Sequence, residues 1–283
     1  MQPGILHDIT DEVYFADPSV SNSDLKLLGR SAAHFKYAKQ HPKESTPDML
    51  IGSSLHHAVL QPESFMDCHG IIPANAPARP TKPQLASKNP TELAMDRISF
   101  WEQFDMVNEG KLIITDDQAG EFLHIGGMIR NHPELSVYFD KGVAERAIFA
   151  VDPICGIPVK CKADWLTKVH SLKICLEMKS TKDARKGPFT RDAYKYGYFT
   201  AATFYQDVME WSIGRPDLYL IVAFEKEPPY GVKIYEIPEG DIDRGRSKYG
   251  ANLALYAHCV ETDTWPNYDT TIETLSLPPW AKD

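Results

Sequence analysis

The 283-residue sequence lacks several features that would place it in a specialised class of protein. It has no run of about 20 apolar residues that could cross a bilayer. Its first residues contain acids and no basic region followed by an apolar run, so we expect no secretory signal and a cytoplasmic location. With 43% hydrophobic and 24% charged residues, the composition is that of an ordinary globular protein.

Cysteine is scarce, with five residues in the chain, and none of them forms a Cys-x-x-Cys pair. An odd number of cysteines in a chain of this size predicts reduced thiols, because a large core does not depend on disulfides. The missing Cys-x-x-Cys spacing argues against a structural zinc ion or an iron–sulfur cluster. We assign these thiols no chemistry.

Positive charge is also in deficit, since the formal net charge is -9. Nucleic acid is bound by neutralising its phosphates with Lys and Arg, so the whole chain is not expected to attract it generally. The segment 160–195 is different, because it holds ten Lys or Arg residues against four acids, a local excess of +6. Considered alone, this run is either a solvated face or a phosphate-binding surface.

The organisation favours a single domain, 1–283, without internal repeats or a Ser/Gly-rich linker. Prolines between residues 70 and 90 predict an extended excursion. The first half, 1–141, is predicted to be mainly helical. Its expected helices are 22–40 with Ser23 as the cap, from Asp48 to Gln61, from Asn89 as the cap to Asn108, and from Thr115 with a capping box to about 131.

From residue 142 the hydrophobic period changes to two, which predicts a β-meander. A long helix from about Phe189 to Trp211 follows. The strands LYLIVAF and GVKIYEI and a helix of about 240–260 complete the pattern. The part 142–283 is therefore expected to hold the sheet and the catalytic core of an α/β fold.

One constellation in this part suggests chemistry. Glu177 and Lys179 lie two apart in a predicted strand and so share a face, and Asp164 joins them if the preceding strand pairs as a hairpin. Two carboxylates and an ammonium in one place are costly unless a divalent cation offsets the repulsion. Mg²⁺ prefers carboxylate, water and phosphate ligands, and Lys179 would stabilise the charged transition state of phosphodiester hydrolysis. The alternative is a surface ion pair, because the bare pattern is common.

Several segments, in order, make the chain resemble the PD-(D/E)XK nuclease superfamily, and specifically the C-terminal nuclease domain of the RecE family (exodeoxyribonuclease VIII). The resemblance implies a restriction-endonuclease-like core, with a central mixed β-sheet flanked by helices and a helical N-terminal half. The segments that carry it are 11–25, 50–65 with GSSLHHAVLQPE, 144–166, 176–184, 196–207 and the tail 262–283.

The resemblance also implies roles for single residues. Asp164 and Glu177 match the metal-binding acids, Lys179 matches the catalytic lysine, and the backbone carbonyl of Met178 is expected to join the metal ligands. His56 matches a helix histidine expected beside the metal, although a core or surface histidine is the alternative. A further acid, Glu145, is a candidate ligand or an exposed strand glutamate. His57 has no family role.

The resemblance favours the phosphate-binding interpretation of the basic segment 160–195, because this segment surrounds the expected site. Related nucleases often carry Gln-x-x-x-Tyr in the helix that follows, whereas this chain has Ala201 in place of the Gln, with Gln206 as a substitute. Ser21, Ser23 and Arg30 could form a pocket for a 5′-phosphate, or the serines could simply cap a helix. The expected DNA-binding residues are Lys182, Arg185, Lys186, Arg191, Tyr205, Ser23 and Arg30.

The implied activity is degradation of the 5′ strand of linear duplex DNA, with one or two Mg²⁺ ions per site and Mn²⁺ as a substitute. The implied partners are double-stranded DNA ends, a RecT-type single-strand annealing protein and further copies of the chain in a ring, tetrameric or else trimeric. A bacterial host and a phage or prophage origin go with them. The alternatives are an endonuclease of the same superfamily and a DNA-binding protein whose catalytic centre has decayed.

Overall fold

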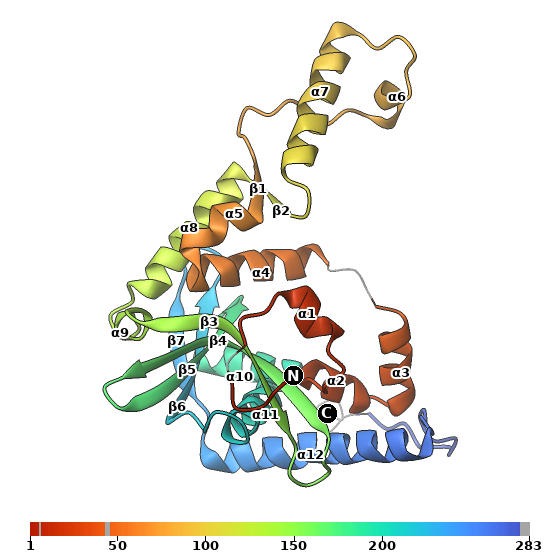
Figure 1. Ribbon diagram of the computed structural model, residues 1–283, viewed down its shortest axis with the longest axis vertical. Coiled ribbons are helices and arrows are strands. Elements are labelled where there is room, and N and C mark those ends of the chain that lie inside the picture. The colour runs from red at the N-terminus through yellow and green to blue at the C-terminus, as the bar shows by residue number, and fades with distance from the viewer. Residues whose placement is uncertain (6, 43–45, 278–283) are drawn as a thin grey trace.

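The alternating second half of the chain forms a five-stranded mixed sheet with the strand order β3-β4-β5-β6-β7 (Figure 1). The computed structural model describes residues 1–5, 7–42 and 46–277, so the last six residues of the tail lie outside it. Neighbouring strands are antiparallel except β5 and β6, which are parallel because two helices connect them. The mixed sheet and its flanking helices confirm the predicted fold class. The strands are β3 (Gly142–Val151), β4 (Pro158–Val169), β5 (Leu172–Thr181), β6 (Leu218–Glu225) and β7 (Val232–Glu236).

Each face of the sheet is covered by its own layer of helices and its own apolar core. Alternating side chains of the strands supply both cores, as a doubly covered sheet requires. One core lies between the sheet and the helices α2 (Asn22–Leu28), α3 (Ala32–Gln40), α10 (Lys186–Tyr196), α11 (Tyr198–Glu210) and α12 (Glu239–Thr262). The other lies under α4 (Pro47–Leu60), α8 (Asp116–Arg130) and α9 (Ser136–Phe139). The short α1 (Asp11–Ala16) and the pair η1 (Pro62–Ser64) and α5 (Phe65–Cys68) complete the layers.

Two predicted helices are each broken into two. The helix expected over 22–40 is interrupted after α2, because Ser21 and Ser31 each accept a backbone N–H three residues on and so begin separate helices. The predicted cap, Ser23, lies inside α2 instead. The helix expected from Phe189 is divided into α10 and α11 by Gly197, whose φ of 75° ends a helix as only glycine does readily.

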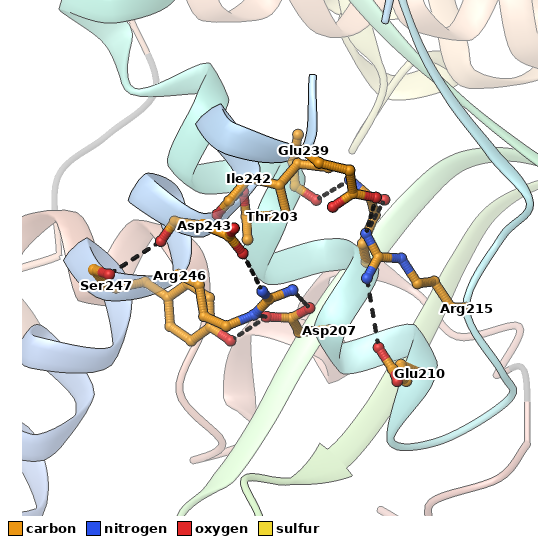
Figure 2. A network of polar contacts seen from close by, with 12 residues as sticks. Thr203, Asp207, Glu210, Arg215, Glu239, Ile242, Asp243, Arg246 and Ser247 are labelled. Carbon is orange, nitrogen blue, oxygen red and sulfur yellow. Dashed lines mark hydrogen bonds and ion pairs between the residues drawn. The ribbon is translucent and has the colours of Figure 1, made fainter. Parts of the chain in front are cut away.

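Helices α11 and α12 are joined by a polar network (Figure 2). Asp207 of α11 is 2% exposed and accepts two hydrogen bonds of 2.8 Å from the guanidinium of Arg246 on α12. Tyr249 donates a third bond to the same carboxylate. Gly245 allows the helices to approach, since a Cβ there would lie 2.4 Å from Thr203 Oγ1. The network holds the two helices in one arrangement on the sheet.

Residues 69–115 form an arm that stands away from the sheet (Figure 1). Its base is a parallel pair that the sequence did not predict, β1 (His69–Ile72) with β2 (Leu112–Thr115). Between them lie α6 (Lys82–Leu85) and α7 (Glu92–Val107). The chain lacks regular structure at Pro73, Pro77 and Pro80 as predicted, but Pro83 lies in the first turn of α6, where a proline is tolerated. The cap of α7 is Thr91 rather than the predicted Asn89, because Thr91 accepts the N–H of Ala94. The predicted capping box of Thr115 with Gln118 is confirmed.

All five cysteines are free thiols. Within the described ranges, no helix has the length and apolar character needed to span a bilayer.

Candidate active site

Three side chains from three elements bring potential metal ligands together. His56 of α4, Glu145 of β3 and Asp164 of β4 each offer one ligand atom, and these atoms lie within 4.8 Å of one another. The His56 Nδ1 atom is 3.8 Å from Asp164 Oδ2. Asp164 is 8% exposed, so its carboxylate has little water to stabilise its charge. The structure thus places three of the sequence-predicted site residues side by side.

The sheet creates this group by a local break in its ladder. Strands β3 and β4 pair on both sides of one position, and at that position Glu145 and Asp164 face each other without pairing. Glu145 has a φ of 52°, a left-handed conformation that is rare for a residue with a side chain. Asp164 Oδ2 instead accepts the backbone N–H of Met178 on β5 at 2.7 Å. The break turns two strand carboxylates toward one point.

Glu177 and Lys179 share a face of β5, as the alternation predicts. Glu177 is 5% exposed, and its carboxylate accepts hydrogen bonds from Lys179 Nζ and, at 3.0 Å, from the Tyr219 hydroxyl. It is not one of the three residues whose ligand atoms lie within 4.8 Å. Lys179 Nζ also lies 5.4 Å from the centre of the Tyr198 ring. The structure therefore pairs Glu177 with the lysine more closely than with the other acids.

The charges of these groups perturb one another strongly. Burial, and after it the positive charge of Lys179, lowers the pKa of His56 to about 3, which the Met178 carbonyl offsets only in part. Burial and the negative charge of Glu177 raise the pKa of Asp164. Burial disfavours the charged form of Lys179, but Glu177 and Asp164 outweigh it and raise the pKa of the ammonium. Perturbed, interacting groups of this kind are typical of functional sites.

The donor set suits a divalent cation. Carboxylate oxygens are ligands that Mg²⁺ and Mn²⁺ prefer, and a neutral imidazole nitrogen is the form of histidine that binds metals. A cation between Glu145 and Asp164 would offset the desolvation and repulsion of their carboxylates. His56, Glu145 and Asp164 are therefore the residues that would hold it, with the Met178 carbonyl next to them.

A cavity of about 730 Å³ opens over the group. Tyr205, Ser21 and Ser23 line it, as do His57 and Lys162. His57 is held by Ser64, which lies 2.9 Å from its Nε2 atom. The cavity thus gathers two predicted DNA-binding residues, Tyr205 and Ser23, with the candidate metal ligands.

Lys162 is a residue that the sequence analysis did not single out. Its Nζ atom lies 2.8 Å from Glu145 Oε2 and 2.5 Å from Asp11 Oδ1. Burial lowers the pKa of the Lys162 ammonium, but the negative charges of Glu145 and Asp11 have the larger effect, so the pKa is raised. Its place two residues before Asp164, on the same strand, was the signal that could have identified it.

The other predicted DNA-binding residues lie elsewhere. Lys182, Arg185, Lys186 and Arg191 are exposed but do not line this cavity. Arg30 is also outside it and donates a hydrogen bond of 3.1 Å to the Tyr268 hydroxyl. The structure therefore does not bring Ser21, Ser23 and Arg30 together into one phosphate pocket. Ser21 caps α2, as its simpler interpretation proposed.

The helix that departs from the related nucleases is α11. Ala201 is half-buried one turn before Tyr205, on the same face of the helix. Gln206 is buried, accepts from Arg215 and donates to the Ala202 carbonyl at 3.3 Å. It lies outside the cavity that opens over the candidate metal ligands, which we call the catalytic cavity after its proposed role, because the next position of a helix is turned by about 100°. Gln206 does not take the place of the missing glutamine.

The sequence and fold were compared with known proteins. Residues 21–278 match a family described as "PDDEXK-like domain of unknown function (DUF3799)". A solved structure from Eubacterium rectale, described as "Putative exonuclease", shares the fold with a TM-score of 0.58, 13% identity and 96% of both chains covered. An alkaline exonuclease from Laribacter hongkongensis is 12% identical over 72% of this chain and 97% of that chain, with a TM-score of 0.29. No curated protein matches the sequence.

These findings confirm the superfamily that the sequence resembles, whereas the finer assignment to RecE stays a prediction. The family match covers most of the chain, including every candidate ligand. The mixed sheet, which carries Glu145 and Asp164, is part of this PDDEXK-like domain. The protein therefore belongs to the PDDEXK-like family DUF3799.

Proposed function

We propose that this protein is a Mg²⁺-dependent exodeoxyribonuclease that degrades the 5′ strand of linear duplex DNA. The observation that carries the proposal is the group formed by His56, Glu145 and Asp164, whose ligand atoms lie within 4.8 Å of one another. Lys179 is the cation next to them, held by Glu177. A buried acid, a half-buried acid, an imidazole and an ammonium are parts suited to metal-assisted phosphodiester hydrolysis.

Each residue has a proposed task. His56, Glu145 and Asp164 hold the metal, with the Met178 carbonyl and Glu177 as further proposed ligands. A bound divalent cation would acidify a water molecule and neutralise charge on the phosphate.

Lys179 donates hydrogen bonds to the attacking water or to the phosphate oxygens, and Glu177 orients it through the contact between their side chains. Tyr219 orients Glu177 in turn by its bond of 3.0 Å. Lys162 balances the charge of Glu145 from the other side.

The polarity and the partners in this proposal come from the resemblance to RecE. Cleavage from the 5′ end leaves a 3′ overhang, which a RecT-type annealing protein would receive. A homo-oligomeric ring, tetrameric or trimeric, would keep the enzyme on its duplex. Ser23 lines the cavity and is proposed to meet a 5′-phosphate, whereas the Ser21 hydroxyl already donates a hydrogen bond of 2.8 Å to Asp24.

One digestion experiment tests the proposal. Linear duplexes with a 5′-phosphate or a 5′-hydroxyl and a supercoiled circle are incubated with Mg²⁺, with Mn²⁺ or with EDTA. We expect metal-dependent loss of a label at the 5′ ends of the linear duplexes and sparing of the circle. Cutting of the circle would identify an endonuclease instead. Binding of DNA without any cleavage in either metal would identify a decayed enzyme and overturn the proposal.

A further inference from the structure

The catalytic cavity is poorly suited to attract DNA by itself. Its lining includes the acids Asp8, Asp11, Glu145 and Asp164, against the cations Arg146 and Lys162. The whole chain carries a formal charge of -9. Because affinity for nucleic acid comes mainly from cations that replace counterions at phosphates, binding energy has to come from another part of the surface.

Such a surface lies beside the cavity, where α2, the turn between α10 and α11, and α12 meet. Two hollows of about 230 and 530 Å³ share Tyr194, Gly197, Thr200 and Lys248 in their linings and so form one continuous surface. We call it the basic–aromatic patch. Its cations are Lys26, Arg30, Arg191, Lys195, Arg244 and Lys248.

The patch is short of negative charge. Among the described residues that line the two hollows, Asp241 is the single acid, and it is occupied by Arg244 at 2.9 Å. Lys26, Lys195 and Lys248 are exposed. Exposed cations without nearby acids attract a polyanion, in contrast to the cations of the catalytic cavity, which already face carboxylates.

Tyrosines add a second kind of contact. Tyr194 is 79% exposed and Tyr196 is 46% exposed, so both rings are accessible to a ligand. Lys195 and Lys26 place their ammonium groups 5.2 and 6.0 Å from the centre of the Tyr196 ring. Lys26 also donates a hydrogen bond of 3.3 Å to the Tyr196 carbonyl. Exposed rings among cations are the combination that binds single strands, because unpaired bases stack on rings while phosphates meet the cations.

The patch is connected to the catalytic cavity through one residue and to Lys179 through a pair of rings. Asn22, at the start of α2, lines both the cavity and the smaller hollow. The rings of Tyr196 and Tyr198 stack with centres 5.9 Å apart, and Tyr198 in turn lies 5.4 Å from Lys179 Nζ. The patch therefore adjoins the cavity at Asn22 and lies one tyrosine away from Lys179.

The elements that carry the patch are held firmly. Asn252 of α12 donates a hydrogen bond of 3.0 Å to the Leu25 carbonyl of α2. The network of Asp207 and Arg246 ties α12 to α11 (Figure 2). A binding surface on packed helices is preorganised, so less conformational entropy is lost when the ligand binds.

We propose that the basic–aromatic patch binds single-stranded DNA next to the catalytic cavity. Duplex DNA fits less well, since paired bases hide the faces that Tyr194 and Tyr196 would stack on. This inference rests on the proposed function for the source of the strand, which is the unpaired DNA at a duplex end that is being digested. It is separable from cleavage, because the patch contains none of the candidate metal ligands.

The first test measures binding of fluorescein-labelled dT20 by fluorescence anisotropy in EDTA. Tyr194→Ala and Tyr196→Ala are each expected to weaken binding about tenfold, the usual consequence of losing one stacked base. Tyr37→Ala is the matched control, because Tyr37 is 63% exposed but lies on α3, outside both hollows. Thermal unfolding of each variant at the parent temperature shows that the fold is intact.

The second test varies the salt concentration with two triple variants of equal charge. Loss of Lys26, Lys195 and Lys248 to Ala is expected to reduce the slope of log affinity against log salt by about 2, since each phosphate contact contributes about 0.7. The control replaces three exposed lysines outside the hollows, Lys82, Lys88 and Lys233, and its slope should equal that of the parent.

The outcomes separate the two proposals. If every patch variant binds dT20 as the parent does, the patch is not the single-strand site, whatever the nuclease activity is. Displacement of labelled dT20 by polyglutamate as readily as by unlabelled dT20 would make the patch a general anion surface and overturn the assignment. Normal dT20 binding by a protein that cleaves no DNA would overturn the proposed function and leave the patch in place.

Discussion

The catalytic cavity and the basic–aromatic patch lie next to each other and have opposite character. The cavity gathers the buried Asp164 and the half-buried Glu145 around His56, and its cations Arg146 and Lys162 are paired with acids of the lining. The patch gathers exposed cations and rings and holds one acid among the described residues of its lining. A divalent metal needs the first environment and a phosphate chain needs the second, so one surface could not serve both. If the patch binds DNA as proposed, its local positive charge would allow a chain with a net charge of -9 to hold its substrate.

The largest effect is expected for Lys179→Ala. Loss of an ammonium that stabilises developing charge typically lowers the rate of the chemical step about 10²–10³-fold. Cleavage of a linear duplex with Mg²⁺, followed by release of labelled nucleotides, measures it. Binding of dT20 should stay at the parent level, because Lys179 does not line the patch. A Lys179→Ala protein that digests DNA as fast as the parent would remove the lysine from the mechanism.

The metal group predicts the next largest effect. Mn²⁺ should raise the melting temperature of the parent, because a ligand that binds the folded state stabilises it. Asp164→Asn and Glu145→Gln should weaken metal binding about 10–100-fold, and the shift in melting temperature at a given Mn²⁺ concentration should shrink accordingly. Glu12→Gln removes an exposed acid outside the cavity and is the control. An undiminished shift in Asp164→Asn would show that the metal binds elsewhere.

A third prediction concerns the helix pair that joins the two regions, since Tyr205 of α11 lines the cavity and Lys248 of α12 lines the patch. Asp207→Asn should lower the free energy of unfolding by about 2 kcal/mol, because the bonds to Arg246 and Tyr249 lose the buried charge that strengthens them. Urea unfolding measures this change. Asp243 is the other partner of Arg246, and its side chain is 72% exposed. Asp243→Asn should therefore lower the free energy of unfolding by about 0.5 kcal/mol or less. Equal costs for both variants would contradict the importance of the buried carboxylate.

The smallest effect is expected where the chain departs from related nucleases. Ala201→Gln places an amide one turn before Tyr205, which lines the catalytic cavity. A neutral hydrogen bond contributes about 0.5–1.5 kcal/mol, so cleavage should rise about two- to tenfold. Initial rates at subsaturating duplex measure the change, and binding of dT20 to the patch should not vary. A fall in the rate would show that the small side chain is needed here.

Local patterns predicted much of the fold. Alternating apolar residues predicted β3, β4 and β5, and the segments LYLIVAF and GVKIYEI were correctly expected to form β6 and β7. The capping box at Thr115 predicted the start of α8. The small parallel pair β1–β2 escaped prediction, because its two four-residue strands are about 40 residues apart and neither has a distinctive period. The breaks at Ser31 and Gly197 were also missed, since the hydrophobic pattern continues across both.

The sequence by itself determined the candidate catalytic residues Asp164, Glu177 and Lys179. It also determined the superfamily, which the family match over residues 21–278 confirms. Tertiary structure decided which of them meet. His56 lies 108 positions before Asp164, and only the packing of α4 against the sheet brings them together. The break between β3 and β4 turns Glu145 into the same group, while Glu177 pairs with Lys179 and Tyr219. Short-range patterns encode the strand and its alternation, but a ladder break and a helix contact depend on residues that are distant in the chain.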